Sequence, residues 1–167
     1  MKKIISALAV VVALSVSSLN YGTAHAQDFD KGIAAYSAGD YATALQELRP
    51  LAEQGDAGAQ FLLGIMYRNG RGVLQDYTEA VSWYRKAAEQ GYVNAQNNLG
   101  FMYGNGRGVL QDNILAHMWA NISSANGNEN GSEGRDIMAK EMTPQDISAA
   151  QAMARDCMSS NYQNCGY

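Results

Sequence analysis

Residues 59–76 of this chain read AQFLLGIMYRNGRGVLQD, and residues 95–112 read AQNNLGFMYGNGRGVLQD. The second stretch follows the first by 36 residues and keeps the glycine-rich loop and the final aspartate in register. A repeat of this length cannot bury its own apolar face, so its copies must stack and share a core. The sequence therefore predicts a stack of repeats whose product is a curved surface rather than a pocket.

Each copy has the apolar spacing of two α-helices. Ala59, Leu63 and Met66 fall on one face of a first helix, and Ala80 and Trp83 begin the same spacing after the glycine-rich loop. Each copy is thus a pair of helices joined by that loop. The predicted helices of the two copies span residues 56–68, 77–90, 92–103 and 113–125.

Partial copies flank the two clear ones. Upstream, residues 40–44 resemble residues 76–80 at the same spacing, and a helix is expected over residues 29–37 before them. Downstream, a polar, glycine-rich stretch over residues 128–134 precedes a weak helical pattern, and Thr143 then caps a last amphipathic helix. Counting the upstream copy as the first, the chain has three repeats and a degenerate fourth pair. We expect that pair to cover the open face of the last repeat.

This pattern resembles the Sel-1-like repeat family, a branch of the tetratricopeptide-like helical repeats. The period favours this branch, because plain tetratricopeptide repeats run about 34 residues. The resemblance covers about residues 28–127 and implies an all-α fold, a right-handed α-α solenoid of stacked antiparallel helix pairs with a C-terminal helical cap. The matching residues of the second copy are Ala59, Leu63, Gly64, Tyr67, Gly70, Gly72, Val73, Asp76, Ala80, Trp83, Tyr84, Ala87, Ala88, Gln90 and Gly91.

The third copy departs from the second at one packing position. Ala120 stands where the second copy has Tyr84. This change predicts that the last full repeat packs against something other than another standard copy. Leu74 and Leu110 also stand where the family often has proline, which does not threaten the fold.

The N-terminus has the features of a secretory signal peptide. Lys2 and Lys3 precede an apolar run over residues 4–16, and Ala24 and Ala26 supply the small residues that a signal peptidase reads. The run is shorter than the roughly 20 apolar residues that span a bilayer. We therefore expect cleavage near Ala26 and a periplasmic or secreted product without stable membrane insertion. The predicted divisions are a signal peptide over residues 1–26, repeats over residues 27–127 and a helical cap over residues 128–167.

Charge limits the possible partners. Lys2 and Lys3 are the only charged residues before position 27, so the remaining chain has 10 basic and 16 acidic residues and a net charge of −6. Without a basic patch, the chain cannot release counterions from phosphates. This excludes nucleic acid as the expected partner and disfavours an anionic membrane surface. A protein or peptide partner and a monomeric chain are expected.

Cys157 and Cys165 are the only cysteines of the chain. In an oxidising compartment, two cysteines this close are expected to form a disulfide. Such a bridge would hold the C-terminus against the last helix. A metal site needs more ligands than this pair offers, so no metal and no cofactor are expected.

No catalytic residue stands out. His117 is the only histidine after position 26, and neither a serine or cysteine nucleophile nor a cluster of metal ligands accompanies it. The glycine-rich loops lack the spacing and the Lys-Ser/Thr of a phosphate-binding loop. Four aspartates are accounted for by helix N-termini, namely Asp40, Asp76, Asp112 and Asp146. The sequence therefore predicts a protein that is not an enzyme.

The function expected is that of a protein-interaction scaffold in the bacterial cell envelope, which binds a peptide or protein on a concave surface. Two alternatives stay open: a protein that binds or hydrolyses peptidoglycan or another carbohydrate, and a secreted effector that binds a host protein. The concave surface should be lined by first-helix residues that face away from the partner helix. The candidates are Leu62, Ile65, Met66, Arg68, Asn98, Phe101 and Met102.

Overall fold

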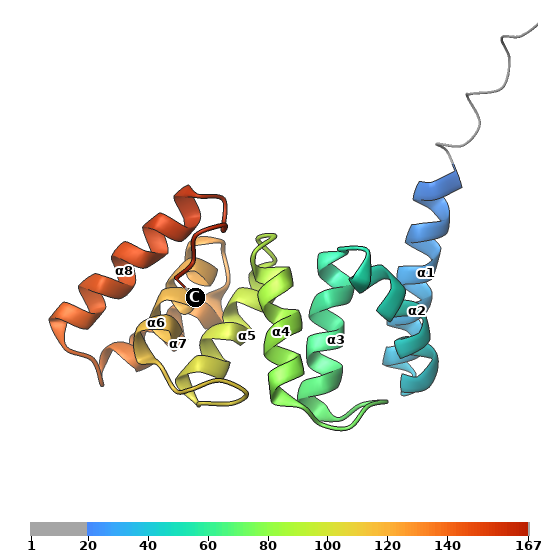
Figure 1. The fold of residues 1–167 in the computed structure, drawn as a ribbon, viewed down its shortest axis with the longest axis horizontal. Helices are drawn as coiled ribbons and strands as arrows, with labels where there is room; N and C mark the ends of the chain where they lie inside the picture. The colour runs from blue at the N-terminus through green and yellow to red at the C-terminus, as the bar shows by residue number, and fades with distance from the viewer. Residues whose placement is uncertain (1–19, 167) are drawn as a thin grey trace, which may run out of the picture.

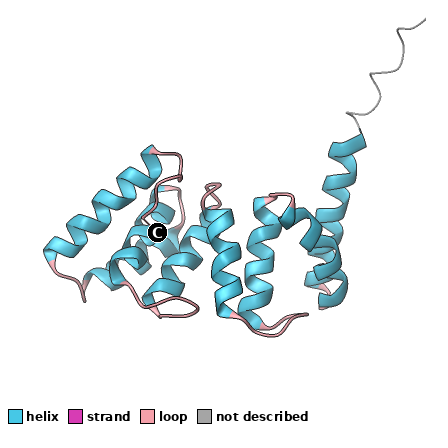
Figure 2. Ribbon diagram, viewed as in Figure 1, coloured by secondary structure: helices cyan, strands magenta, loops and turns pink. Residues whose placement is uncertain are grey.

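The computed structural model describes the backbone of residues 20–166 and the side chains of residues 29–166. The predicted signal peptide lies outside the described residues over positions 1–19. The described residues form eight α-helices and no strand (Figures 1 and 2). The helices are α1 (Asn20–Ser37), α2 (Tyr41–Glu53), α3 (Ala57–Asn69), α4 (Tyr77–Ala88), α5 (Val93–Gly104), α6 (Asn113–Ala125), α7 (Glu129–Ala139) and α8 (Pro144–Ser159).

The helices follow one another along the long axis of the molecule, from α1 at one end to α8 at the other (Figure 1). Each of the first three repeats is a helix pair, and the second helix of each pair packs against the first helix of the next. The helices of the two clear copies agree with their predicted ranges to within two residues, which is the usual uncertainty of a helix end. The predicted all-α solenoid is confirmed.

The core consists of two clusters of buried residues, and each cluster joins neighbouring repeats. Its N-terminal part joins Leu48 of α2 to Leu63 and Met66 of α3, all of them without exposed surface. Its C-terminal part is centred on Trp119 of α6 and reaches Cys157 of α8. Neighbouring repeats thus share their apolar residues, as the short period requires.

The glycine-rich loops are held by close packing on the preceding repeat. Gly72 has φ +72° and Gly108 has φ +73°, the left-handed region that favours glycine. A Cβ at position 72 would lie 2.8 Å from the carbonyl oxygen of Tyr41, and one at position 108 would overlap the carbonyl group of Tyr77. Each loop therefore rests on the first residue of the previous second helix. These contacts repeat with the 36-residue period.

A row of amide side chains joins the repeats, and Gln60 and Gln96 in this row are buried. Gln60 donates from Nε2 to the carbonyl of Ala52 at 3.0 Å, and Gln90 donates to Oε1 of Gln60 at 2.8 Å. The same two contacts return one period later as Gln96 to Ala88 at 3.2 Å and Asn126 to Gln96 at 2.9 Å. Buried amides need such partners, because an unsatisfied polar group inside the core costs free energy. The row fixes the register between neighbouring helix pairs.

The C-terminal helices do not form another regular pair. Both α7 and α8 pack on α6, and α8 makes little contact with α7. The helix α7 also begins earlier than its apolar residues indicate, because Asn128 caps it and accepts from the N–H of Gly131 at 3.2 Å. A Cβ at Gly131 would lie 2.7 Å from Oγ of Ser123, so glycine permits the close approach of α7 to α6.

Cys157 and Cys165 form a disulfide, which ties the residues after α8 back to that helix. The loop it closes carries Tyr162, whose hydroxyl accepts from Nδ2 of Asn126 at 2.9 Å. The row of amides therefore ends on a residue of this loop. Among the described helices, none is long and apolar enough to cross a bilayer.

Candidate functional site

The residues predicted to line a groove do not all reach the surface. Met66 and Met102 have no exposed surface and belong to the core, so their prediction as partner-binding residues is wrong. Both point to the side of the helix that packs on its neighbours, where a methionine fills space between repeats. The remaining candidates are Leu62, Ile65, Arg68 and Asn98, which are half-buried, and Phe101, which is 45% exposed.

The structure has a cavity where the sequence predicted only a curved surface. It lies between α5 and α7, with α6 as its floor, and its volume is about 510 Å³. Of the predicted candidates, only Phe101 lines it. The lining residues are Asn97, Gly100, Phe101, Gly104, Asn105, Ala116, Ala120, Asn130, Glu133, Gly134, Ile137 and Met138.

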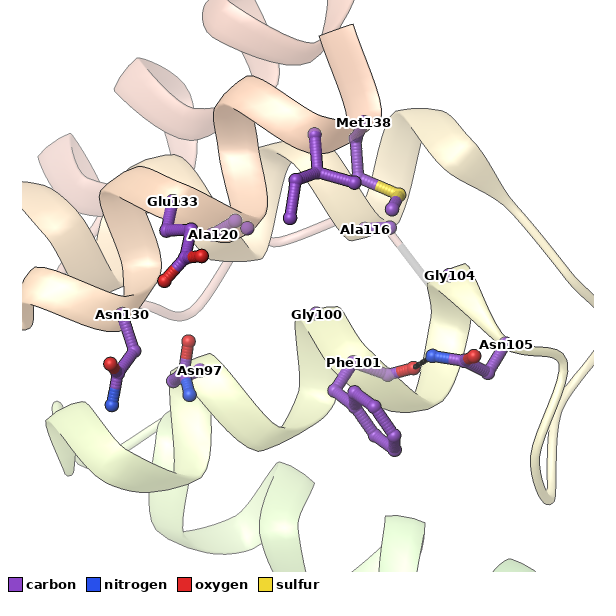
Figure 3. A pocket seen from close by; sticks show the side chains of 12 residues that line it. Asn97, Gly100, Phe101, Gly104, Asn105, Ala116, Ala120, Asn130, Glu133 and Met138 are labelled. Carbon is purple, nitrogen blue, oxygen red and sulfur yellow. Dashed lines mark hydrogen bonds between the residues drawn. The ribbon is translucent and has the colours of Figure 1, made fainter. Parts of the chain in front are cut away.

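The floor of the cavity is apolar and built from small residues. Gly100 and Gly104 of α5 face Ala116 and Ala120 of α6, so little side-chain volume stands between these helices and α7 (Figure 3). The thioether of Met138 closes the wall, and a Cβ at Gly104 would lie 3.2 Å from its sulfur. Such a floor suits an apolar group of a ligand.

The mouth of the cavity is polar at one end and apolar at the other. Figure 3 shows Glu133 and Asn130 of α7 pointing toward Asn97 of α5. At the other end, Phe101 is 45% exposed with its ring turned away from α7, and Ile137 is 47% exposed. An apolar floor with a few polar groups at the mouth is the usual composition of a binding site.

The position of Phe101 is set by its neighbours. Its carbonyl accepts from Nδ2 of Asn105 at 2.8 Å, and the guanidinium of Arg107 lies 5.4 Å from the centre of its ring. Arg107 also lies 5.6 Å from the ring centre of Tyr77. The glycine-rich loop therefore links the exposed ring to the preceding repeat by cation–π contacts.

His117 lies outside this cavity and inside the core. It is 1% exposed, and its Nδ1 has no hydrogen-bond partner among the described residues. Burial lowers the pKa of His117 and nearby Arg135 lowers it further, whereas Asp136 acts in the opposite direction. Among the described side chains, those of residues 29–166, no three His, Cys, Asp or Glu residues are placed to hold a metal ion.

The sequence analysis missed the residues of α7 and the floor of the cavity. Asn130, Glu133 and Ile137 lie in or after the polar stretch that carried no clear helical signal. The one available signal was the change from Tyr84 to Ala120, because a cavity arises where a large side chain is absent. From the sequence alone, that change predicts altered packing and does not indicate a site.

The architecture is that of an α-helical repeat protein, and the comparisons with known proteins name the family. The family model described as Sel1 repeat matches residues 57–92 and 93–128. A crystal structure of a Sel1 repeat protein from Oxalobacter formigenes matches with 36% identity and a TM-score of 0.62, over 70% of this chain and 90% of that one. The chain belongs to the Sel1 repeat family.

A second crystal structure aligns more fully with this chain. It is that of a protective antigen present in uropathogenic Escherichia coli strains, which displays an SLR fold. The match has 30% identity and a TM-score of 0.78 and covers 83% of this chain, but this chain spans only 31% of that protein. Comparison with curated protein sequences gave no match. Sel1 repeat proteins generally mediate protein–protein interactions and are typically non-catalytic scaffolds.

Proposed function

We propose that this protein is a non-enzymatic scaffold of the bacterial cell envelope that binds a protein or peptide segment across its first helices, at the α5–α7 cavity. The single observation that carries the proposal is this cavity of about 510 Å³ with Phe101 and Ile137 exposed at its edge. Two large apolar side chains beside an open, apolar floor would be costly to leave in water. A partner that covers these two side chains gains free energy of binding from their burial.

The half-buried candidates extend the proposed surface along the stack. Ile65 of α3 occupies the position that Phe101 has in α5, one period earlier. Leu62 and Asn98 share the equivalent position one turn before them. A partner lying across both helices would meet an apolar residue on each, with the cavity at one end. Extended contact of this kind suits a peptide or a helix of the partner.

The location in the envelope is supported by the N-terminal sequence and by the disulfide. Disulfides persist in oxidising compartments such as the bacterial periplasm. The bridge between Cys157 and Cys165 fits an exported chain. Mass spectrometry of the protein from fractionated cells tests this part of the proposal. A periplasmic or secreted product that begins near Gln27 is expected.

The binding proposal is tested by charge substitutions on this face. Phe101→Glu and Ile137→Glu should each lower partner capture at least tenfold, because a carboxylate would have to be buried against an apolar partner. Leu110→Glu is the matched control, since Leu110 is 90% exposed in the loop of the same repeat and does not line the cavity. Capture is measured by crosslinking in intact cells, and circular dichroism verifies that each variant is folded. Equal capture by all three variants would overturn the proposal.

The glycan alternative is favoured by the amide groups at the cavity. Asn97, Asn105 and Asn130 offer donors and acceptors beside the exposed ring of Phe101. Sedimentation with purified peptidoglycan separates the two possibilities. Binding to peptidoglycan that Phe101→Glu abolishes would show that the partner is a glycan and not a protein. If the chain stays in the supernatant, the proposal of a protein-binding scaffold stands. His117→Ala is expected to change neither result, because His117 does not reach the cavity.

A further inference from the structure

The cavity lies where the preceding repeat holds an aromatic ring. Tyr84 of α4 precedes Ala120 of α6 by one period of 36 residues. Tyr84 has no exposed surface, and its ring lies so close to Gly64 that a Cβ there would overlap it. The ring centre of Phe61 lies 6.0 Å away. In the second repeat, this tyrosine fills the space above the first helix.

The third repeat keeps the glycine that faces this ring but not the ring, and Asn97 stands where the second repeat has Phe61. Gly100 is the equivalent of Gly64, and it lines the cavity together with Ala120. The next helix does not replace the missing volume, because it places Gly134 over this position. A Cβ at Gly134 would meet only the Cβ of Ala120, at 3.9 Å. An aromatic side chain is therefore absent from the position where the second repeat holds one.

We propose that the α5–α7 cavity binds one aromatic side chain of the partner, in the position that Tyr84 occupies in the preceding repeat. This inference rests on the proposed function and adds the chemistry of the bound group. The thioether of Met138 lies at the wall, and sulfur makes favourable contacts with aromatic rings. The volume of about 510 Å³ accommodates a ring and the backbone that carries it.

The charge at the mouth adds a second feature of the partner. Glu133 is exposed, and no lysine or arginine among the described residues forms an ion pair with it. Its carboxylate points toward Asn97 at the entrance (Figure 3). A bound segment with a lysine or arginine next to its aromatic residue would pair with this carboxylate. An acidic segment would be repelled.

The ring site is tested with small analogues of the two aromatic side chains, p-cresol for tyrosine and toluene for phenylalanine. Each is titrated into the protein while the methyl resonances of Met138 and Ile137 are followed by NMR. We expect saturable shifts at both methyl groups, and the tighter of the two probes identifies the preferred residue. No shift at either methyl group with either probe would overturn the inference.

Two variants close the cavity from opposite sides. Ala120→Tyr restores the ring of the second repeat, and Gly134→Leu fills the same space from α7. Each should weaken probe binding at least tenfold, and the second variant keeps the test valid if the first does not fold. Ala125→Tyr adds the same side chain at an exposed position of α6 and should bind the probes as the parent does. Unchanged binding by both filled variants would place the probes elsewhere and overturn the inference.

The charge feature is tested with two toluene derivatives of similar size and opposite charge, 4-methylbenzylammonium and 4-methylbenzoate. The cation should bind at least fivefold more tightly than the anion, and Glu133→Gln should remove the difference. Equal binding of the two probes to the parent would overturn the inference that the partner has a lysine or arginine next to its aromatic residue.

The same variants separate this inference from the proposed function. Loss of partner capture with Phe101→Glu but full capture with Ala120→Tyr and Gly134→Leu would overturn the aromatic anchor and leave the scaffold function. Probe binding that the filled variants block, together with full capture by Phe101→Glu and Ile137→Glu, would support the ring site and overturn the proposed function.

Discussion

The second and third repeats are built alike and are covered differently. Both have the same glycine-rich loop, the same aspartate cap and the same buried amide contacts. The second helix of the second repeat is covered by α5, the first helix of another copy, whereas that of the third is covered by α7 and α8. These three features thus stay constant where the outer contact of the repeat changes. A site can arise at that outer contact without loss of the fold.

One of the side chains that differ between the two repeats bears directly on the cavity. Tyr84 fills the second repeat, and Ala120 leaves the equivalent space in the third open to solvent. Two further contacts hold the segments that cover the third repeat. One is the row of amides, which ends on Tyr162 instead of on a further copy. The other is the disulfide that holds the loop of Tyr162 in place.

The largest expected effect comes from giving the second repeat the residue of the third. Tyr84→Ala should lower the free energy of unfolding by about 3 to 5 kcal/mol, since it removes a buried ring and leaves a cavity. Urea denaturation measures the loss. Tyr84→Phe is the control and should cost much less, because only the buried hydroxyl, whose pKa burial raises to about 12, is removed. A loss below about 1 kcal/mol for Tyr84→Ala would mean that the surroundings collapse onto the space.

The same variant sharpens the comparison with the natural cavity. A dry apolar cavity made by substitution can bind a small aromatic molecule. p-Cresol should therefore raise the melting temperature of Tyr84→Ala by more than that of the parent, in which only the α5–α7 cavity is open to it. An equal rise in the two chains would show that the two spaces are not equivalent.

The next effect concerns a feature that both repeats share. Gly72→Val and Gly108→Val should each lower the free energy of unfolding by about 2 to 4 kcal/mol, from backbone strain at positive φ and from overpacking. Gly108→Val should be the worse, because its side chain would overlap the carbonyl of Tyr77. Gly39→Val is the control: it has φ +81° but no atom within 4 Å of its Cβ. Thermal unfolding of all three separates strain from close packing.

The sequence predicted the repeated helices but not the cavity, which arises where a side chain is absent. The period placed the helices of the second and third copies, because apolar spacing and caps are local signals. It could not distinguish Met102, which faces the core, from Phe101 beside it, which faces solvent. Neighbouring positions on an amphipathic helix differ by about 100° in direction, so a small error in the assumed face moves a residue from surface to core.

The α7 helix was hidden for a different physical reason. Its first turns contain Gly131 and Gly134. Glycine has poor helix propensity, and it adds no side chain to an apolar face of the helix. Packing on α6 stabilises the helix instead, and glycine is the residue that permits the approach. Because that contact is tertiary, no local sequence pattern indicates it. The cavity shares this cause, since five of its twelve lining residues belong to α7.

The disulfide holds the segment after α8 at the end of the stack, where α7 and α8 cover α6 in place of a further repeat. Replacing both Cys157 and Cys165 by serine should lower the free energy of unfolding by about 2.5 kcal/mol, the chain-entropy estimate for a loop this short. Hydrogen exchange should rise around Asn126 and Tyr162, whose contact depends on the closed loop. The amide contacts of Gln60 should keep their protection. Equal exchange in parent and variant would show that Tyr162 holds the loop without the bridge.

The smallest expected effect is a pH dependence that belongs to the third repeat alone. His117 is buried in α6, and burial together with nearby Arg135 holds its pKa below the ordinary value in the folded chain. The unfolded chain therefore binds more protons than the folded one as the pH falls through the ordinary range of histidine near 6.5, so acid favours unfolding. Stability should be full above that range and decline below it, by at most about 1.4 kcal/mol per pH unit for one proton.

The measurement is urea denaturation of the parent and of His117→Gln between pH 5.5 and 7.5. The difference between the two chains isolates this residue, because His25 and the carboxyl groups are common to both. The second repeat has Val81 at the equivalent position, so its packing contributes no such term. If the two chains lost stability in parallel as the pH fell, the proton would be taken up elsewhere. Burial of the His117 imidazole would then make no contribution to the pH dependence of stability.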